Sequence, residues 1–245
     1  SSSVVKEILG RDHVEGIVID GQRLNAETVI VAARVKPEVE LWREAGVNVG
    51  EAGGIRVDDR MATNLPDVYA VGDCVETKSA ITGKGVLLQL ATTAVRQAFV
   101  AGSNAAGGFE TYFASTGVIS TKLFGLEVAC AGLTTEASKS IGLSPISARV
   151  SASTRLPYMA DASEVIVKLL CTPEDRRLIG AQIVGHENIA WRANFASLAM
   201  HAGLTVHEFR RVETCYAPPL APVWDPLTLA AQALERKLEA SLRDR

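Results

Sequence analysis

Residues 63–76 read TNLPDVYAVGDCVE, and the rest of the chain can be interpreted outward from this stretch. The apolar and aromatic run at residues 68–71 predicts a short strand that is buried on both faces. The run stops at Gly72 and Asp73, where a glycine lets a ligand approach the backbone and a carboxylate can accept hydrogen bonds from sugar-like hydroxyl groups. The stretch therefore predicts a nucleotide or flavin site, although a plain turn after a core strand would give the same local pattern.

Three neighbouring segments extend this pattern, namely GIRVD at residues 54–58, MAT at 61–63 and PDVYAVGD at 66–73. Together they resemble the second flavin-binding signature of the pyridine nucleotide-disulfide oxidoreductases. The resemblance implies that Gly72 and Asp73 are cofactor-binding residues, with Asp73 on the ribityl chain of FAD.

Composition and charge exclude several other classes of function. The 245 residues are 47% hydrophobic and 22% charged, with a net charge of -3, which is an ordinary globular composition. No basic surplus points to nucleic acid or to anionic lipid. No apolar run is long enough to span a membrane, and the first residues lack the features of a signal peptide. We therefore expect a cytoplasmic protein.

The four cysteines lie far apart in the sequence, at Cys74, Cys130, Cys171 and Cys215. No C-x-x-C pair occurs, and no histidine stands at metal-ligand spacing from any of them. We therefore predict neither a metal site nor a redox pair, and we expect four buried free thiols.

The region before the signature predicts mostly extended structure. The expected elements are strands at residues 4–9, 14–19 and 28–33, a tight turn at Asp20-Gly21, and a short helix at residues 40–45 that Gly46 closes. The family resemblance implies that residues 1–50 are the tail of an NAD(P)H-binding domain. Arg34 and Glu38 depart from the family pattern, in which a glycine and an asparagine are usual.

The region after the signature predicts a helix over residues 87–101, ended by Gly102 and by Gly107-Gly108. Its expected buried face consists of Leu87, Leu90, Ala91, Ala94, Val95 and Ala98. The resemblance implies that this helix start faces the pyrimidine edge of the flavin, with Leu90 and Ala91 at the cofactor. A plain packing helix is the alternative. The GKGVLL segment at residues 83–88 is not a phosphate loop, because no strand directly precedes it.

The residue pattern changes at Phe109, which we interpret as a domain boundary. The expected strands are residues 117–124, 126–131, 144–153, 163–170 and 178–184, and the expected helices are residues 134–142 and 188–202. This order is an α+β layer. It resembles the dimerisation domain of the same family, most closely in LIGAQIVG at 178–185 and AGLTV at 202–206. The predicted fold is thus α/β plus α+β, with residues 51–108 as the C-terminal segment of the FAD-binding domain and 109–245 as the dimerisation domain.

The segment CYAPPLAPVWDP at residues 215–226 is rich in proline and therefore stiff, and Asp225 with Pro226 can start a final helix. It lacks the His-Glu pair of glutathione and lipoamide reductases and resembles the branch of coenzyme A-disulfide reductases, NADH oxidases and persulfide or polysulfide reductases. That branch implies catalytic roles for Tyr216 and Tyr158, which reach the partner subunit's active site. A phenol there can donate a proton to a leaving thiolate. Alternatively, both tyrosines only pack, and Met159 after Tyr158 departs from the usual Pro-Gly.

The resemblance therefore implies a portion of an FAD-dependent NAD(P)H oxidoreductase that forms a homodimer. Electrons would pass from NAD(P)H through the flavin to a small-molecule disulfide, a persulfide or polysulfide, or oxygen. The flavin fingerprint, the redox cysteine and the NAD(P)H-binding βαβ unit are missing, so we expect a part of a longer protein. The alternative is a non-catalytic dimerisation module, because Asp73 alone cannot hold a pyrophosphate. A ferredoxin reductase relative is disfavoured by the VWDP sequence.

Overall fold

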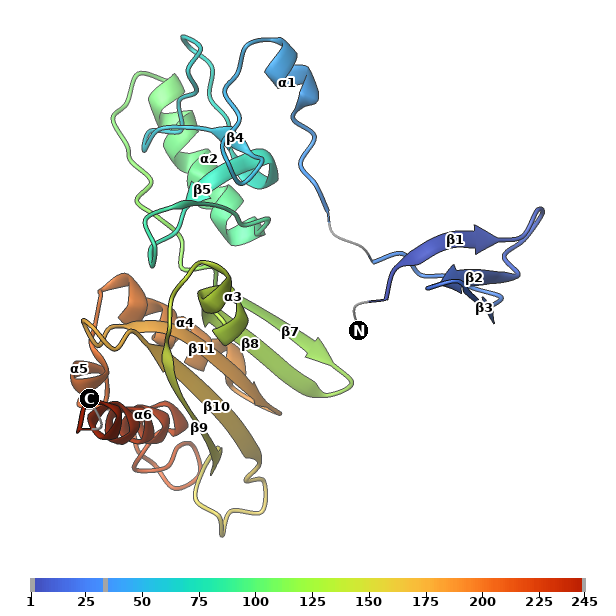
Figure 1. Ribbon diagram of the computed structural model, residues 1–245. Helices are drawn as coiled ribbons and strands as arrows, with labels where there is room; N and C mark the ends of the chain where they lie inside the picture. The colour runs from blue at the N-terminus through green and yellow to red at the C-terminus, as the bar shows by residue number, and fades with distance from the viewer. Residues whose placement is uncertain (1–2, 33–34, 244–245) are drawn as a thin grey trace. The chain divides into compact units, whose positions relative to one another are not determined.

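The computed structural model describes residues 3–32 and 35–243, and the chain divides into two compact units, Ser1–Lys36 and Pro37–Arg245 (Figure 1). The first unit is an antiparallel sheet of β1 (Val5–Leu9), β2 (Gly16–Ile19) and β3 (Gln22–Asn25), in the order β1-β2-β3. Asp20 and Gly21 have φ angles of 50° and 83° in the two-residue turn between β2 and β3. The predicted hairpin turn is confirmed.

The strand predicted at residues 28–33 is wrong. Residues 28–32 are irregular, and the side chains of Ile30 and Val31 are 87% and 74% exposed. A β-rich run becomes a strand only where a second strand takes up its backbone hydrogen bonds, and no described residue pairs with this run. Ala33 and Arg34 lie outside the described residues.

The first part of the second unit holds the Gly-Asp signature. Its elements are α1 (Glu40–Glu44), β4 (Ile55–Arg56), the 3-10 turn η1 (Gly72–Cys74), β5 (Val75–Lys78), β6 (Gly85–Leu87) and α2 (Ala91–Ala105). The strands form a small sheet in the order β4-β5-β6, in which β4 is parallel to β5 and β6 is antiparallel to it. The predicted short helix at residues 40–45 is confirmed, and Gly46 follows it with a φ of 91°.

The strand predicted before Gly72 is also wrong, because it is displaced along the chain. Residues 68–71 are half-buried and make one isolated bridge, between Tyr69 and Ala62. The strand lies instead after Asp73, at β5, where Val75 and Thr77 are buried. Pairing with β4 and β6, rather than local apolar character, decides which segment becomes a strand.

Helix α2 begins later than predicted and buries a different face. It starts at Ala91, continues through Gly102 and ends at Ala105. Val95 is 56% exposed, and Leu87 lies in β6 rather than in the helix. The residues that are buried instead are Thr93, Gln97, Val100, Ala101 and Asn104. Three of these residues are polar. The predicted buried face is therefore wrong, because the prediction counted only apolar residues at helical spacing.

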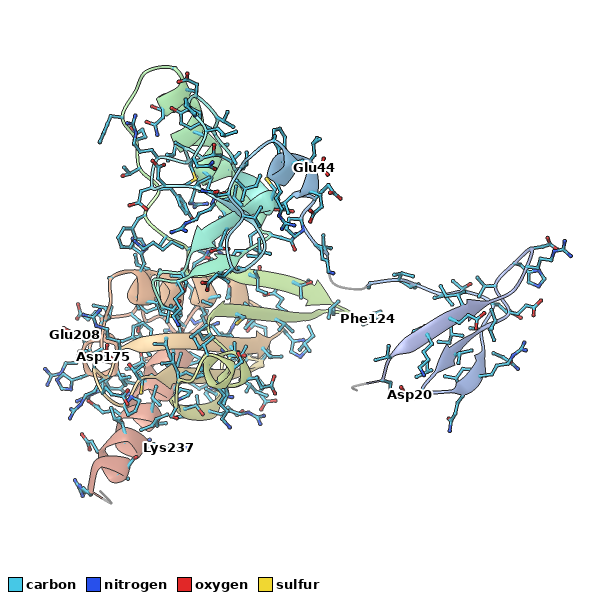
Figure 2. The ribbon with its side chains drawn as sticks, turned by 45° about the horizontal axis from the view of Figure 1, so that its top comes forward. Asp20, Glu44, Phe124, Asp175, Glu208 and Lys237 are labelled. Atoms are coloured by element: carbon cyan, nitrogen blue, oxygen red, sulfur yellow. The ribbon has the colours of Figure 1, made fainter. Side chains whose placement is uncertain are left out.

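The second part of the second unit is a five-stranded antiparallel sheet with helices on both faces. Its strands are β7 (Ile119–Leu123), β8 (Leu126–Gly132), β9 (Ile146–Ser153), β10 (Glu164–Cys171) and β11 (Leu178–Gly185), in the order β7-β8-β11-β10-β9. The helices are α3 (Thr135–Ser140), α4 (Ile189–His201), α5 (Val206–Phe209) and α6 (Pro226–Arg243). The elements expected in this region are confirmed, including the β7–β8 turn that has Phe124 at its tip (Figure 2).

The main core lies between one face of this sheet and two helices. Helix α4 packs over β8 and β11, and α6 packs over β9 and β10 (Figure 1). Val165, Val167 and Leu169 of β10 are fully buried on this face. Lys168 between them points to the opposite face, where its Nζ donates to Thr135 Oγ1 of α3 at 2.7 Å. The sheet thus gives a rigid base for the loops at its ends.

Candidate cofactor site

The Gly72–Asp73 pair forms a tight turn, not the end of a strand. Gly72 has a φ of 84°, which glycine adopts without strain, and Val75 N–H closes the turn onto Gly72 O. Asp73 is exposed, and its carboxylate makes no hydrogen bond or ion pair with the part of the chain that the structure describes. The carboxylate is therefore free to accept hydrogen bonds from a ligand.

A buried amide on α2 holds this turn in place. Gly72 N–H donates to Gln97 Oε1 at 2.9 Å, and Gln97 Nε2 donates to Thr77 Oγ1 at 2.8 Å. Gln97 is 0% exposed. Because a backbone N–H can only donate, Oε1 must face Gly72, and this fixes which way the amide points. The sequence analysis missed Gln97, although it stands at helical spacing from Thr93 and Val100.

The first turn of α2 borders a pocket of about 300 Å³. Leu90 is the residue before the helix, with extended backbone and no side-chain cap, and its carbonyl accepts from Thr93 and Ala94. The N–H groups of a helix start carry partial positive charge and suit an acceptor or an anion. The pocket is lined by Leu90, Ala91, Thr92, Val118, Ile119, Ser120, Ala190, Ala193 and Asn194.

The four predicted cofactor residues thus lie at or beside one helix, α2. Ala94, one turn after Leu90, lies against Gly72, whose Cβ position would be 3.6 Å from the Ala94 Cβ. The turn with Asp73 and the helix start with Leu90 and Ala91 therefore lie along the same side of α2. Asp73 does not line the pocket at the helix start. A ligand that contacts both the Asp73 carboxylate and the pocket at the helix start must therefore be elongated.

A larger pocket of about 590 Å³ lies beside β4 and β5. Its charged lining residues are Glu51, Asp58, Asp59 and Glu76 against Arg56, Lys78 and Lys84. Because carboxylates outnumber cations, this pocket does not favour a pyrophosphate. Ala52 N–H also occupies one Glu76 oxygen, at 2.8 Å.

Tyr158 lies in the loop between β9 and β10 and is largely exposed. Arg155 braces this loop by ion pairs to Asp161 and Glu187, and Thr154 Oγ1 donates to Glu187 Oε1 at 2.6 Å. Burial raises the pKa of the Glu187 carboxyl, but the hydrogen bonds from Thr154 and Arg155 outweigh it and hold the pKa below its ordinary 4.5.

Tyr216 lies in the segment between α5 and α6 and is 52% exposed. It lines a pocket of about 460 Å³ together with Arg210, Arg211 and Trp224. No hydrogen bond joins its phenol to Asp73 or to Tyr158 within residues 3–32 and 35–243. The two predicted catalytic tyrosines are therefore displayed on separate loops of the subunit.

The expectation of four buried thiols is wrong for three of them. All four cysteines are free, but only Cys171 is buried, whereas Cys74 and Cys130 are half-buried and Cys215 is exposed. Burial raises the pKa of the Cys74 thiol, and the charge of Asp73 raises it further. Cys215 is exposed because the proline-rich segment around it lies on the surface rather than in the core.

Two possible sites are absent from the described residues. No group of histidine, cysteine, aspartate and glutamate side chains among residues 3–32 and 35–243 is arranged to hold a metal ion. Over the same residues, no helix has the length and apolar character needed to cross a membrane.

The fold is that of the C-terminal part of an α/β nucleotide-binding domain followed by an α+β domain. The family model for pyridine nucleotide-disulphide oxidoreductases matches residues 1–98, and the model for the dimerisation domain of the same family matches residues 118–226. The chain belongs to the pyridine nucleotide-disulphide oxidoreductase family, as the signature predicted.

Individual relatives agree with this assignment. The chain is 36% identical to an NADH oxidase of Methanocaldococcus jannaschii over 97% of its own length, and 39% identical to a CoA-dependent NAD(P)H sulfur oxidoreductase of Pyrococcus furiosus over 93%. It covers 52% and 51% of those proteins. The solved structure of an NAD-dependent persulfide reductase from A. fulgidus matches with a TM-score of 0.92 and 33% identity, over 98% of this chain and 45% of that one. The chain thus spans about half the length of these relatives.

Proposed function

We propose that this chain is the C-terminal portion of an FAD-dependent NAD(P)H oxidoreductase that reduces a small disulfide, a persulfide or polysulfide, or oxygen. The observation that carries the proposal is the Gly72–Asp73 turn, which presents an unpaired carboxylate beside α2. The names of the relatives, an NADH oxidase and sulfur or persulfide reductases, support the same range of acceptors. Residues 1–50, 51–108 and 109–245 would belong to the NAD(P)H-binding, FAD-binding and dimerisation domains, in a cytoplasmic enzyme.

The residues present fit one half of a flavin site. The Asp73 carboxylate would accept hydrogen bonds from the ribityl hydroxyl groups, and the N–H groups at Ala91 would face the ring edge that becomes electron-rich on reduction. When bound, FAD would supply the transfer of electrons from NAD(P)H to the acceptor. No described residue forms a phosphate cradle, so the pyrophosphate would be held by residues outside this chain.

Tyr216 and Tyr158 would act across a homodimer. Both phenols are exposed in the single subunit, which leaves them available to a partner's active site. Each could donate a proton to a thiolate as it leaves the acceptor. Exposed apolar side chains on α4 and on the proline-rich segment, including Trp191, Leu198 and Trp224, support a dimer interface formed by these two segments.

A non-catalytic dimerisation module is the second candidate. It is favoured by the acidic lining of the 590 Å³ pocket, which would not hold a pyrophosphate. In this case the chain would dimerise through residues 109–245 without binding FAD.

Measuring FAD binding by the purified 245-residue chain and by the full-length protein distinguishes the two candidate functions. We expect the full-length protein to carry stoichiometric FAD by its visible spectrum, and Asp73→Ala to weaken FAD binding about 10-fold or more, as for the loss of hydrogen bonds to a charged acceptor. Glu239→Ala, which removes an exposed carboxylate on α6, is the control. FAD binding that survives Asp73→Ala unchanged would overturn the flavin assignment. A yellow, stoichiometric 245-residue chain would exclude the module.

A further inference from the structure

We propose that Gln97 is a positioning residue that sets the Asp73 carboxylate for the flavin. This inference rests on the proposed function, since it concerns the same site. The side chain of Gln97 is fully buried on α2, so it offers no exposed group to a ligand beside Asp73. It acts through the turn that carries Asp73.

The carboxamide of Gln97 holds the turn from both of its ends. Gly72 begins the turn and donates its N–H to Oε1 at 2.9 Å, while Thr77 of β5, three residues after the turn ends, accepts from Nε2 at 2.8 Å. One side chain therefore fixes the segment before Asp73 and the strand after it. The position of Asp73 along α2 is set by this pair of bonds.

The chemistry of the site suits an amide. Gly72 presents a donor and Thr77 presents a hydroxyl that can accept, and Thr77 is itself 3% exposed. A glutamine offers one acceptor and one donor at the right separation, whereas a leucine of similar size would leave both groups without a partner. Such unpaired groups would be relieved by moving the turn away from α2.

The Asp73 side chain has no other restraint that the structure shows. Its carboxylate makes no hydrogen bond with the described residues, so its direction follows the backbone of the turn. Gly72 faces the helix, because a Cβ added at Gly72 would lie 3.6 Å from the Cβ of Ala94, in ordinary van der Waals contact. A small displacement of the turn would therefore move the carboxylate relative to the helix start at Leu90.

The same helix offers a matched control residue. Asn104 is also a buried amide on α2, and it bonds to Arg60 O at 3.0 Å and to Glu110 N and O at 2.8 Å each. Neither partner belongs to the Gly72 turn or to β5. Asn104→Leu should destabilise the protein as Gln97→Leu does, without moving Asp73.

The first experiment needs no cofactor. Amide hydrogen exchange at Gly72 is measured in the purified 245-residue chain and its variants. We expect exchange at Gly72 to accelerate about 10-fold in Gln97→Leu, as for the loss of one hydrogen bond, and to stay unchanged in Asn104→Leu. Unchanged exchange in Gln97→Leu would overturn the inference.

The second experiment measures the FAD dissociation constant of the full-length protein. We expect it to rise about 10-fold in Gln97→Leu and to stay near the wild-type value in Asn104→Leu. Gln97→Glu should restore most of the affinity, because a carboxyl oxygen still accepts from Gly72 and the Thr77 hydroxyl can rotate to suit it. Equal losses in the leucine variants of both amides would assign Gln97 a structural role only.

A third variant covers the case in which Gln97→Leu does not fold. Thr77→Val removes only the second bond and should weaken FAD binding by a smaller factor, about 3-fold. An FAD affinity that falls in Asp73→Ala but stays unchanged in Thr77→Val would overturn the inference on Gln97 and leave the flavin assignment standing. An affinity unaffected by Asp73→Ala would overturn the flavin assignment, whatever the exchange at Gly72 shows.

Discussion

Arg192 of α4 donates from Nε to Oδ2 of Asp225 at 3.1 Å, and this pair ties α4 to the first turn of α6. Arg192 is 8% exposed, and its Nη1 atom has no hydrogen-bond partner among the described residues. The other Asp225 oxygen accepts the N–H of Leu227 at 2.9 Å and caps α6. One carboxylate thus neutralises a buried charge and starts a helix, directly after the segment that carries Tyr216.

Asp225→Ala is expected to destabilise the protein by about 3–5 kcal/mol, because it leaves the buried guanidinium without a counter-charge and removes the cap. Asp225→Asn keeps one of the two acceptor oxygens, so it retains the bond to either Leu227 or Arg192 but not both, and should lose about half as much. Urea unfolding at neutral pH measures both. A loss below about 1 kcal/mol in Asp225→Ala would mean that water or a partner subunit solvates Arg192.

Glu187 predicts how stability responds to acid. Its pKa is held below 4.5 in the folded chain by Thr154 and Arg155, so the folded form binds its proton less readily than the unfolded form. The resulting stability is fully present above about pH 4.5 and is lost as the pH falls through the lowered pKa.

Glu187→Gln should therefore reduce the melting temperature at pH 7 and flatten its decline between about pH 5 and pH 3. Glu239→Gln, at an exposed site on α6, is the control and should follow the wild-type curve. A Glu187→Gln curve parallel to that of the wild type over this range would contradict the assignment of the acid response to the Arg155 brace.

The cysteines should differ sharply in reactivity. Burial raises the pKa of the Cys171 thiol to about 12, helped by the charges of Asp175, in the turn after β10 (Figure 2), and Glu174. Cys215 is exposed. Since the thiolate is the nucleophile, alkylation of the native chain at pH 8 should modify Cys215 first and Cys171 only after unfolding. Mass spectrometry of the labelled peptides measures this, and Cys215→Ser should abolish the fast phase. Fast labelling of Cys171 would indicate that β10 opens.

The α+β part of the fold could be predicted from the sequence because its signals are local. A nearly continuous apolar run marks β10, glycines mark the turns at Gly125 and Gly142, and Asp225 with Pro226 marks the start of α6. These cues depend on neighbours within a few residues. They therefore gave the element types correctly in this region.

The other regions could not be predicted in this way because their structure depends on distant partners. Residues 28–32 and 68–71 have the composition of strands, but among the described residues the first run makes no ladder and the second makes only the bridge between Tyr69 and Ala62. The buried face of α2 includes Gln97, which accepts a hydrogen bond from Gly72 N–H and donates one to Thr77 Oγ1. The Gly-Asp signature predicted the candidate site, whereas Gln97, which holds the turn, was missed because it is polar.

Tyr216 offers the sharpest test of the chemistry proposed for the homodimer. Tyr216→Phe in the full-length protein keeps the ring and removes only the phenol, so the reduction of the flavin by NAD(P)H should be unchanged. Turnover with a disulfide acceptor should fall by about 10²–10⁴-fold, the usual contribution of a general acid, and the same variant of Tyr158 should show a loss of the same kind. Stopped-flow kinetics separate the two half-reactions. Tyr112→Phe, at a half-buried phenol elsewhere in the subunit, is the control.

With oxygen as acceptor no thiolate leaves, so neither tyrosine variant should lose rate. Equal losses with both acceptors would mean that the phenols shape the dimer instead of donating a proton.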